Sequence, residues 1–289
     1  MPRISDLLAG GPPYSFEFFP PKTDAEQATL TRTIRELEPL EPSFVSVTYR
    51  GGPSSRARTY DLVSGMRHAT SLTPMAHLIC VAHTRLELAE ILVSFRKAGV
   101  ENLMALGGDP PTDPTEGPGE LRHACELVDL ARAIGGFSIG VAAHPGGHPA
   151  SPSRESDRDY LAEKLRLADF AVTQFFFDAD EYLGLVDDLA VRGVDKPVLP
   201  GIMPVTSLRS IPRMAEMGSA LPSWMVERLE GASADGGAEA VRRIGVAIAI
   251  ELCEKLLAAG VPGLHFYTLN RSSATREIYD ALDLGPGAG

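Results

Sequence analysis

Short apolar segments alternate with amphipathic segments along nearly the whole of this 289-residue chain. The apolar segments have the length of strands and are apolar on both faces, as parallel strands covered by helices are. They predict strands at residues 14–19, 43–48, 74–80, 102–107, 137–143, 170–176, 197–202 and 263–268. The amphipathic segments predict helices at residues 24–38, 57–69, 84–95, 119–134, 155–167, 179–192 and 238–259.

Eight strands, each followed by a helix, predict an α/β fold of the (β/α)8 TIM-barrel type. An open, doubly wound sheet is the alternative, but it ordinarily has a glycine fingerprint after its first strand, where this chain has two prolines. The segment 203–237 is too long for a simple loop and predicts an extra helix near 222–230, after the seventh strand. We expect the barrel to occupy residues 1–284 and the tail 285–289 to be disordered.

Charge and composition exclude several classes of protein. The formal net charge of -11 argues against nucleic-acid binding, which usually requires a basic surface. Three widely spaced cysteines show no disulfide or metal-ligand pattern and indicate a reduced, cytoplasmic protein. We find no signal peptide and no apolar run long enough to span a bilayer, so no membrane partner is expected. The oligomeric state is left open.

The first predicted strand carries one acidic residue, Glu17, between aromatic neighbours, and it ends at Pro20 and Pro21. A carboxyl group there is poorly solvated, which disfavours its ionised form and suits a general acid. Glu17 can equally be a structural residue that pairs with an arginine from elsewhere in the chain. The sequence around Glu17 does not decide between these two interpretations.

Polar residues also fall at the carboxyl ends of most other predicted strands, where barrel active sites lie. They are Glu17, Thr48, His77, Asp109, His144 with His148, Gln174, and the run 267–271 that ends at Arg271. A ring of polar side chains at one rim favours a functional site over a purely structural role.

Several members of this ring also have structural interpretations. A lone strand histidine such as His77 is often a hydrogen-bonded core residue, and Asp109 lies in a glycine- and proline-rich turn. Gln174 lies among apolar residues and must find hydrogen-bond partners. The spacing of His144 and His148 suits a metal, but no third ligand follows, so we predict no metal site.

Several kinds of chemistry are excluded because the rim lacks the groups that they require. No lysine lies at a strand end to form a Schiff base, no glycine-rich loop opens a helix, and no carboxylate cluster suggests two metals. An acid, a second carboxylate and an amide suit the protonation and orientation of a planar heterocycle.

Eight segments between residues 14 and 271 together resemble the methylenetetrahydrofolate reductase family. They are SFEFFPPK, FVSVTY, MAHLIC, LGGDPP, VAAHPGGHP, TQFFFD, PGIMPVTS and HFYTLNR. The resemblance implies a (β/α)8 barrel that reduces 5,10-methylenetetrahydrofolate to 5-methyltetrahydrofolate with a reduced nicotinamide, usually through FAD. Eukaryotic members add a regulatory domain, and we do not expect control through such a domain here.

The resemblance also assigns roles to residues of the folate site. Glu17 corresponds to the proton donor of the family, and Asp109 to the aspartate that interacts with the pterin. Gln174 corresponds to the glutamine that contacts the folate, and Arg271 to a further arginine that contacts the substrate.

Further positions correspond to the cofactor site of the family. Thr48 and His77 match positions near the site of hydride transfer. Three positions that contact the flavin in other members correspond to His148, Asp157 and Lys164.

This chain departs from the family at two flavin-contacting positions. Gly107 stands where flavin-binding members have arginine, and His144 replaces a common tyrosine. Loss of the arginine removes a charge-assisted partner of the pyrophosphate. We therefore expect direct hydride transfer from NADH, with FAD-mediated ping-pong reduction and a non-catalytic folate-binding protein as alternatives. The lack of an evident basic cluster for a 2′-phosphate favours NADH over NADPH.

Overall fold

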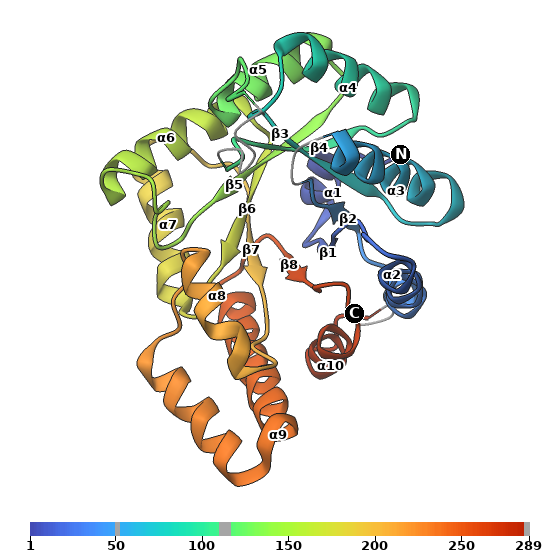
Figure 1. Ribbon diagram of the computed structural model, residues 1–289. Coiled ribbons are helices and arrows are strands. Elements are labelled where there is room, and N and C mark those ends of the chain that lie inside the picture. Colours follow the sequence, from blue (N-terminus) through green and yellow to red (C-terminus); the bar gives the residue numbers. More distant parts are fainter. Residues whose placement is uncertain (50–52, 110–116, 286–289) are drawn as a thin grey trace.

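The computed structural model describes residues 1–49, 53–109 and 117–285. Its strands are all parallel and close into a barrel in chain order, surrounded by helices (Figure 1). The strands are β1 (Tyr14–Phe18), β2 (Phe44–Val47), β3 (Pro74–Ile79), β4 (Asn102–Leu106), β5 (Ser138–Ala143), β6 (Phe170–Phe175), β7 (Val198–Ile202) and β8 (Leu264–Tyr267). The predicted barrel is confirmed, and every strand begins and ends within one residue of its predicted bounds.

A helix follows each strand, and all of these helices except α10 were predicted from the periodicity. They are α2 (Asp24–Leu37), α3 (Pro53–Ala69), α4 (Arg85–Lys97), α5 (Ala124–Ile134), α6 (Arg154–Leu167), α7 (Ala179–Val191), α9 (Ser223–Ala258) and α10 (Ser273–Ala281). Two short helices, α1 (Ile4–Gly10) and α8 (Ile211–Glu216), and two 3-10 turns, η1 (Glu38–Leu40) and η2 (Leu208–Ser210), complete the set. The short elements and α10 were not predicted, because none of them shows a long apolar period.

The structure corrects the starts of two helices, and α3 begins at Pro53, four residues before the predicted start at 57. α5 begins at Ala124, five residues after the predicted start at 119. Its first turn is capped by Glu126, whose carboxylate accepts hydrogen bonds from the backbone N–H groups of Arg122 and His123, each at 2.8 Å. The cap satisfies donors that a longer helix would have paired with its own carbonyl groups.

α9 corresponds to two predicted helices, near 222–230 and at 238–259, joined at a kink. Gly236 and Gly237 have non-helical backbone angles there, and Gly237 has a φ of 64°. The first half of α9 and α8 form an arm that reaches away from the barrel (Figure 1). The second half packs on the barrel, where a Cβ atom on Gly245 would lie 1.8 Å from the carbonyl oxygen of Val205. Only glycine permits this close approach.

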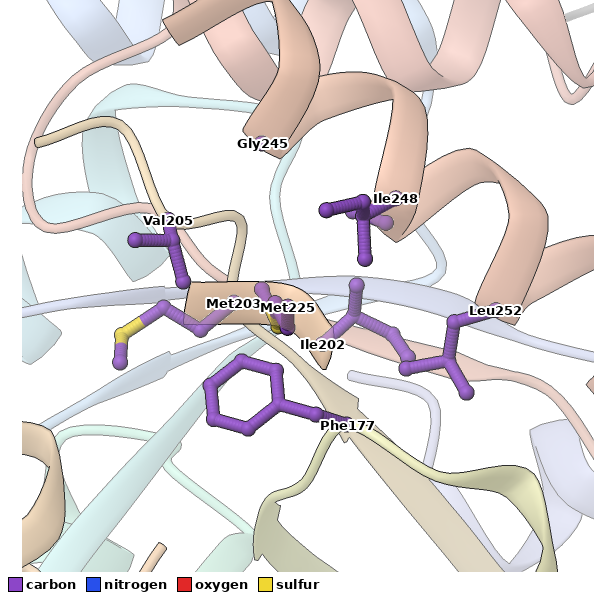
Figure 2. Close-up of a pocket in the computed structure, with 9 residues that line it drawn as sticks. Phe177, Ile202, Met203, Val205, Met225, Gly245, Ile248 and Leu252 are labelled. Carbon is purple, nitrogen blue, oxygen red and sulfur yellow. The ribbon is translucent and has the colours of Figure 1, made fainter. Parts of the chain in front are cut away.

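An apolar pocket lies where α9 covers the ends of β6 and β7 (Figure 2). It is lined by Phe177, Ile202, Met203, Val205, Met225, Gly245, Ile248, Ala249 and Leu252. Its volume of about 10 Å³ is close to the minimum for one water molecule. It is therefore an imperfection in packing, and the substrate site must be sought inside the rim of the barrel.

The amino-terminal end of the barrel is closed by an apolar plug. Ile4 of α1 is fully buried in a cluster with Phe44, Met75, Met104, Phe170, Val172 and Leu199. The backbone N–H of Ile4 donates to Oδ1 of Asn102 at 2.9 Å, which fastens α1 to the start of β4. The polar layer around Glu17 lies on the carboxyl-terminal side of this plug and begins at the level of Ser15 and His265.

Candidate active site

Glu17 projects from β1 into a buried polar layer in the carboxyl-terminal half of the barrel. Its side chain is 18% exposed, and Oε2 lies 3.4 Å from the hydroxyl of Ser46. The same oxygen lies 3.5 Å from Nε2 of His77 and 3.8 Å from Nε2 of His265. Residues from β1, β2, β3 and β8 thus meet at one carboxyl oxygen.

The neighbours of Glu17 in the structure test its two interpretations, as a general acid or as the structural partner of an arginine. Among the described residues, the groups within ion-pair distance of Glu17 are the two imidazoles, and no arginine or lysine joins them. The expected structural ion pair with arginine is therefore not found in this part of the chain. The lack of such a cation among the described residues favours the general-acid interpretation of Glu17.

Burial shifts the pKa values of two other groups in this layer, His77 and Tyr267. The pKa of His77 is lowered from its ordinary value, first by burial and then by His265, while Glu17 opposes the shift. The pKa of Tyr267 is raised well above its ordinary value, mainly by burial and further by Glu17. Both side chains are therefore uncharged at neutral pH. The hydroxyl of Tyr267 donates to the carbonyl oxygen of Thr173 at 2.7 Å.

Ser15, Ser46 and His265 belong to this layer but were missed in the sequence, whereas Tyr267 begins the run 267–271 that was predicted at the rim. Nδ1 of His265 lies 2.8 Å from the hydroxyl of Ser15, and the β1–β8 register places these two residues side by side. The alternation of side chains along a strand could have identified them, because residues two positions apart lie on the same face. Ser15 and Glu17 share one face of β1, and His265 and Tyr267 share one face of β8.

Gln174 lies where the ladder between β6 and β7 is interrupted. The register shifts between Val172 and Phe175, and the N–H of Gly201 donates to the side-chain oxygen of Thr173. Oε1 of Gln174 accepts a hydrogen bond from the N–H of Phe175 at 3.1 Å. The carbonyl end of the amide is thus satisfied locally, and its amino group has no hydrogen-bond partner among the described residues.

Three other predicted residues are not joined to Glu17 by any contact within the described chain. Asp109 and Arg271 are exposed, and neither side chain has a hydrogen bond or ion pair there. Thr48 lies beyond the end of β2, and its hydroxyl is buried without a hydrogen-bond partner among those residues. Nε2 of His77 is likewise buried without a hydrogen bond, so a ligand at the rim would find two unsatisfied polar groups.

A second cluster forms around the loop between β5 and α6. The rings of His144 and His148 lie edge to face with centroids 4.7 Å apart. Burial lowers the pKa of His144 to about 4, and His148 adds to the shift, so His144 is neutral at pH 7. Burial also lowers the pKa of Lys164 to about 8, and its ammonium donates to the carbonyl oxygen of Ala142 at 2.6 Å.

Arg158 holds this loop and was not identified in the sequence, because its helix is strongly polar. Only 1% of its side chain is exposed. The guanidinium donates to the carbonyl oxygens of His144 and Pro145 and to the carboxylates of Asp157 and Asp188. The other oxygen of Asp157 accepts from the hydroxyl of Ser151 at 3.2 Å.

These contacts test whether the chain fits the flavin that the resemblance implies. Both oxygens of Asp157 are engaged within the chain, and His144 offers no positive charge. Lys164 is directed at a backbone carbonyl, and Gly107 has no side chain although the space beside it is open. The residues at these positions therefore do not fit a flavin pyrophosphate, which needs uncommitted cations and hydrogen-bond donors.

Metal sites and membrane spans are two further features that bear on function. The described residues contain no group of three or more His, Cys, Asp or Glu side chains arranged to hold a metal ion. Among the same residues, no helix combines the length and hydropathy that a membrane span requires.

Comparison with known proteins connects this site to a family. The family described as methylenetetrahydrofolate reductase matches residues 3–283. The 5,10-methylenetetrahydrofolate reductase of Salmonella typhimurium is 38% identical over 275 residues, which cover 94% of this chain and 91% of that protein. The Escherichia coli enzyme of the same name is 37% identical over the same shares of the two chains.

Solved structures support the fold at low sequence identity. A Clostridium thermocellum protein described as binding two copies of 5-methyl-5,6,7,8-tetrahydrofolic acid is 12% identical, with a TM-score of 0.68. The similarity covers 96% of this chain and 98% of that one. At this sequence identity the structural similarity shows a shared fold. The family is shown by the sequence matches, which extend over nearly the whole chain. The chain belongs to the methylenetetrahydrofolate reductase family.

Proposed function

We propose that this chain reduces 5,10-methylenetetrahydrofolate to 5-methyltetrahydrofolate, with Glu17 as general acid and NADH as direct hydride donor. The observation that carries the proposal is the setting of Glu17. Its carboxyl group lies beside two imidazoles, and among the described residues no arginine or lysine fixes it as a carboxylate.

The chemistry needs one proton and one hydride. Glu17 donates its proton to N10 of the folate, which breaks the bond from N10 to the methylene carbon and leaves an iminium at N5. Hydride from C4 of the nicotinamide then adds to the methylene carbon and gives the N5-methyl group and NAD⁺. A proton from solvent returns Glu17 to its acid form.

Three further residues are assigned to the folate. The carboxylate of Asp109 stabilises the cationic iminium and the pterin, and Arg271 contacts the substrate. The free amino group of Gln174 holds the edge of the pterin in register with the hydride donor. The exposed positions of Asp109 and Arg271 at the rim support these roles, because both side chains are open to a ligand.

The nicotinamide is assigned to the space beside Thr48, His77 and the loop 144–148. The unsatisfied polar atoms of Thr48 and His77 support this placement, as does the rigid anchoring of the loop by Arg158. The poor fit to a flavin supports direct transfer, for which NADH and folate must be bound together. The absence of an evident basic cluster favours NADH over NADPH.

The decisive variant is Glu17→Gln, with Glu90→Gln on the exposed face of α4 as its control. We expect the change at Glu17 to lower kcat at least about a hundredfold while methyltetrahydrofolate still binds, because the amide has no proton to give. The Glu90 variant should retain full activity. Full activity in the Glu17 variant would remove Glu17 from the mechanism.

The visible spectrum of the purified protein and its initial-rate kinetics test the hydride source. We expect a colourless protein that oxidises NADH with methylenetetrahydrofolate and shows sequential kinetics without added FAD. A yellow protein, or ping-pong kinetics that require FAD, would establish the flavin-mediated alternative. Binding of folate without any NADH oxidation would instead indicate a non-catalytic folate-binding protein.

A further inference from the structure

His265 lies directly behind Glu17 and is held in place on several sides. Its side chain is 1% exposed, and its Nδ1 atom lies 2.8 Å from the hydroxyl of Ser15. The ring stacks on Phe44, with centroids 6.0 Å apart and planes inclined by 15°, and it meets Tyr267 edge to face at 5.3 Å. The Nε2 edge of the imidazole is therefore fixed toward Glu17.

The charge on Glu17 selects the tautomer of this imidazole. A bare lone pair on Nε2 would repel the carboxylate that remains after proton donation, so the proton belongs on Nε2. Nδ1 then accepts the hydroxyl proton of Ser15. The competing acceptor for that hydroxyl, the carbonyl oxygen of Leu264, is 3.4 Å away, against 2.8 Å for Nδ1.

The two oxygens of Glu17 have different surroundings. Oε2 faces Ser46, His77 and His265, whereas no described residue forms a hydrogen bond with Oε1. The hydroxyl of Ser46 donates to Oε2 and two imidazoles lie beside it, so the proton of a neutral carboxyl lies on Oε1. The same groups also stabilise the negative charge that develops when the proton leaves.

His77 cannot replace His265 in this arrangement. No described residue stacks on the ring of His77 or forms a hydrogen bond with it, so it can adjust to a ligand. The titratable groups that face His265 are Glu17 from β1, His77 from β3 and Tyr267 from β8. Its neighbours from β2, Phe44 and Ser46, do not titrate in the working range.

We propose that His265 is a positioning residue for the general acid. Ser15 fixes the ring, and the Nε2–H group anchors Oε2 of Glu17, so that the proton is delivered from Oε1 and the carboxylate left behind is stabilised. The contact of 3.8 Å shortens when substrate is bound, as catalytic contacts often do. This inference rests on the proposed function.

Two substitutions at His265 separate its two nitrogen atoms. His265→Gln places an amide N–H near the position of Nε2, whereas His265→Asn reaches only the position of Nδ1. We expect His265→Asn to lower kcat about tenfold with the KM for folate unchanged, and His265→Gln to keep about half of kcat. In the Asn variant the alkaline limb of the kcat–pH profile should move to higher pH, because the carboxylate has lost a donor.

Ser15→Ala tests the dependence on ring orientation. We expect kcat to fall about threefold in the wild-type background and not at all in the His265→Asn background, because Ser15 acts through His265. Ser138→Ala removes a buried hydroxyl from β5 near α1, at the opposite end of the barrel, and serves as the control that keeps kcat.

Equal kcat values and equal pH profiles for the Asn and Gln variants would overturn this inference, even if both variants melt at a lower temperature. If His265→Asn does not fold, an unchanged kcat–pH profile in Ser15→Ala overturns it instead. A wild-type protein that oxidises no NADH with methylenetetrahydrofolate overturns the proposed function as well. An active wild type with equal variants overturns the inference alone.

Discussion

At the scale of single residues, burial keeps two histidines on the carboxyl-terminal side of the barrel uncharged. His77 and His144 both have a lowered pKa, although one faces Glu17 and the other lies in the loop after β5. Burial is the first cause in both cases, since the charged imidazolium loses more hydration than its neighbours restore. Neutral rings at the rim suit a reaction that passes through a cationic iminium, because they do not repel it.

His144 makes the stability of the protein depend on acid pH. Its pKa is about 4 in the folded chain against 6.5 ordinarily, so only the unfolded chain takes up its proton as pH falls through this interval. Stability is therefore lost between about pH 6.5 and pH 4. We expect His144→Phe to reduce the fall in Tm between pH 7 and pH 4.5 by roughly 5 °C.

Calorimetry at the two pH values provides the measurement for His144. The wild type, scanned under the same conditions, is the reference for the acid dependence of Tm. An acid-induced fall in Tm that is the same in the His144 variant and the wild type would assign the acid sensitivity to other groups.

At the scale of elements, α6 supports the loop that precedes it. Arg158 reaches back from the second turn of this helix to the carbonyl oxygens of His144 and Pro145, and it meets Asp188 on α7. Arg154, one helical turn earlier, meets the same carboxylate at 3.4 Å but is 56% exposed. The two arginines thus share a partner and differ in burial.

Substitutions of Arg158 and Arg154 compare a buried and an exposed partner of the same carboxylate. Arg158→Leu leaves Asp157 without its buried partner, and we expect it to lower the free energy of unfolding by about 3–5 kcal/mol. It should also raise the KM for NADH, because the loop 144–148 loses its anchor. Arg154→Leu should cost less than about 1 kcal/mol and leave KM unchanged, since exposed pairs contribute little. Urea unfolding and initial rates measure both effects, and equal losses in the two variants would contradict this account.

At the scale of the whole molecule, the barrel separates stability from chemistry along its axis. The amino-terminal half holds the apolar plug around Ile4, and the carboxyl-terminal half holds the polar layer around Glu17. The arm formed by α8 and the first half of α9 leaves the barrel beyond β7 (Figure 1). Truncation of Ile4, which lies in the plug away from the polar layer, should therefore affect folding without altering turnover.

Ile4→Ala tests this separation. We expect it to lower the free energy of unfolding by about 2–5 kcal/mol, because a fully buried side chain is truncated, and to leave kcat and KM at 25 °C unchanged. Asp6→Ala, at an exposed position of the same short helix, should change stability by less than about 0.5 kcal/mol. A large loss of kcat in a folded Ile4 variant would show that the two halves are coupled.

The sequence by itself determined the order and bounds of the strands, and through them the closed barrel. Strands that are apolar on both faces avoid water only when one face is buried in the barrel interior and the other under a layer of helices. The same pattern placed Glu17 within the first strand between aromatic neighbours, whereas the structure surrounds its side chain with Ser46, His77 and His265. Resemblance to known segments then supplied the family, whose sequence match covers residues 3–283.

Only the tertiary structure decided what surrounds each functional group. His265 meets Ser15 and Glu17 across the β1–β8 closure, and about 250 positions separate it from Ser15, so no local pattern could pair them. Arg158 looks like a solvated helix residue until α7 and the preceding loop bury it. A local sequence specifies backbone geometry and which side chains avoid water, whereas the partners of a buried charge are set by segments that meet only when the barrel closes.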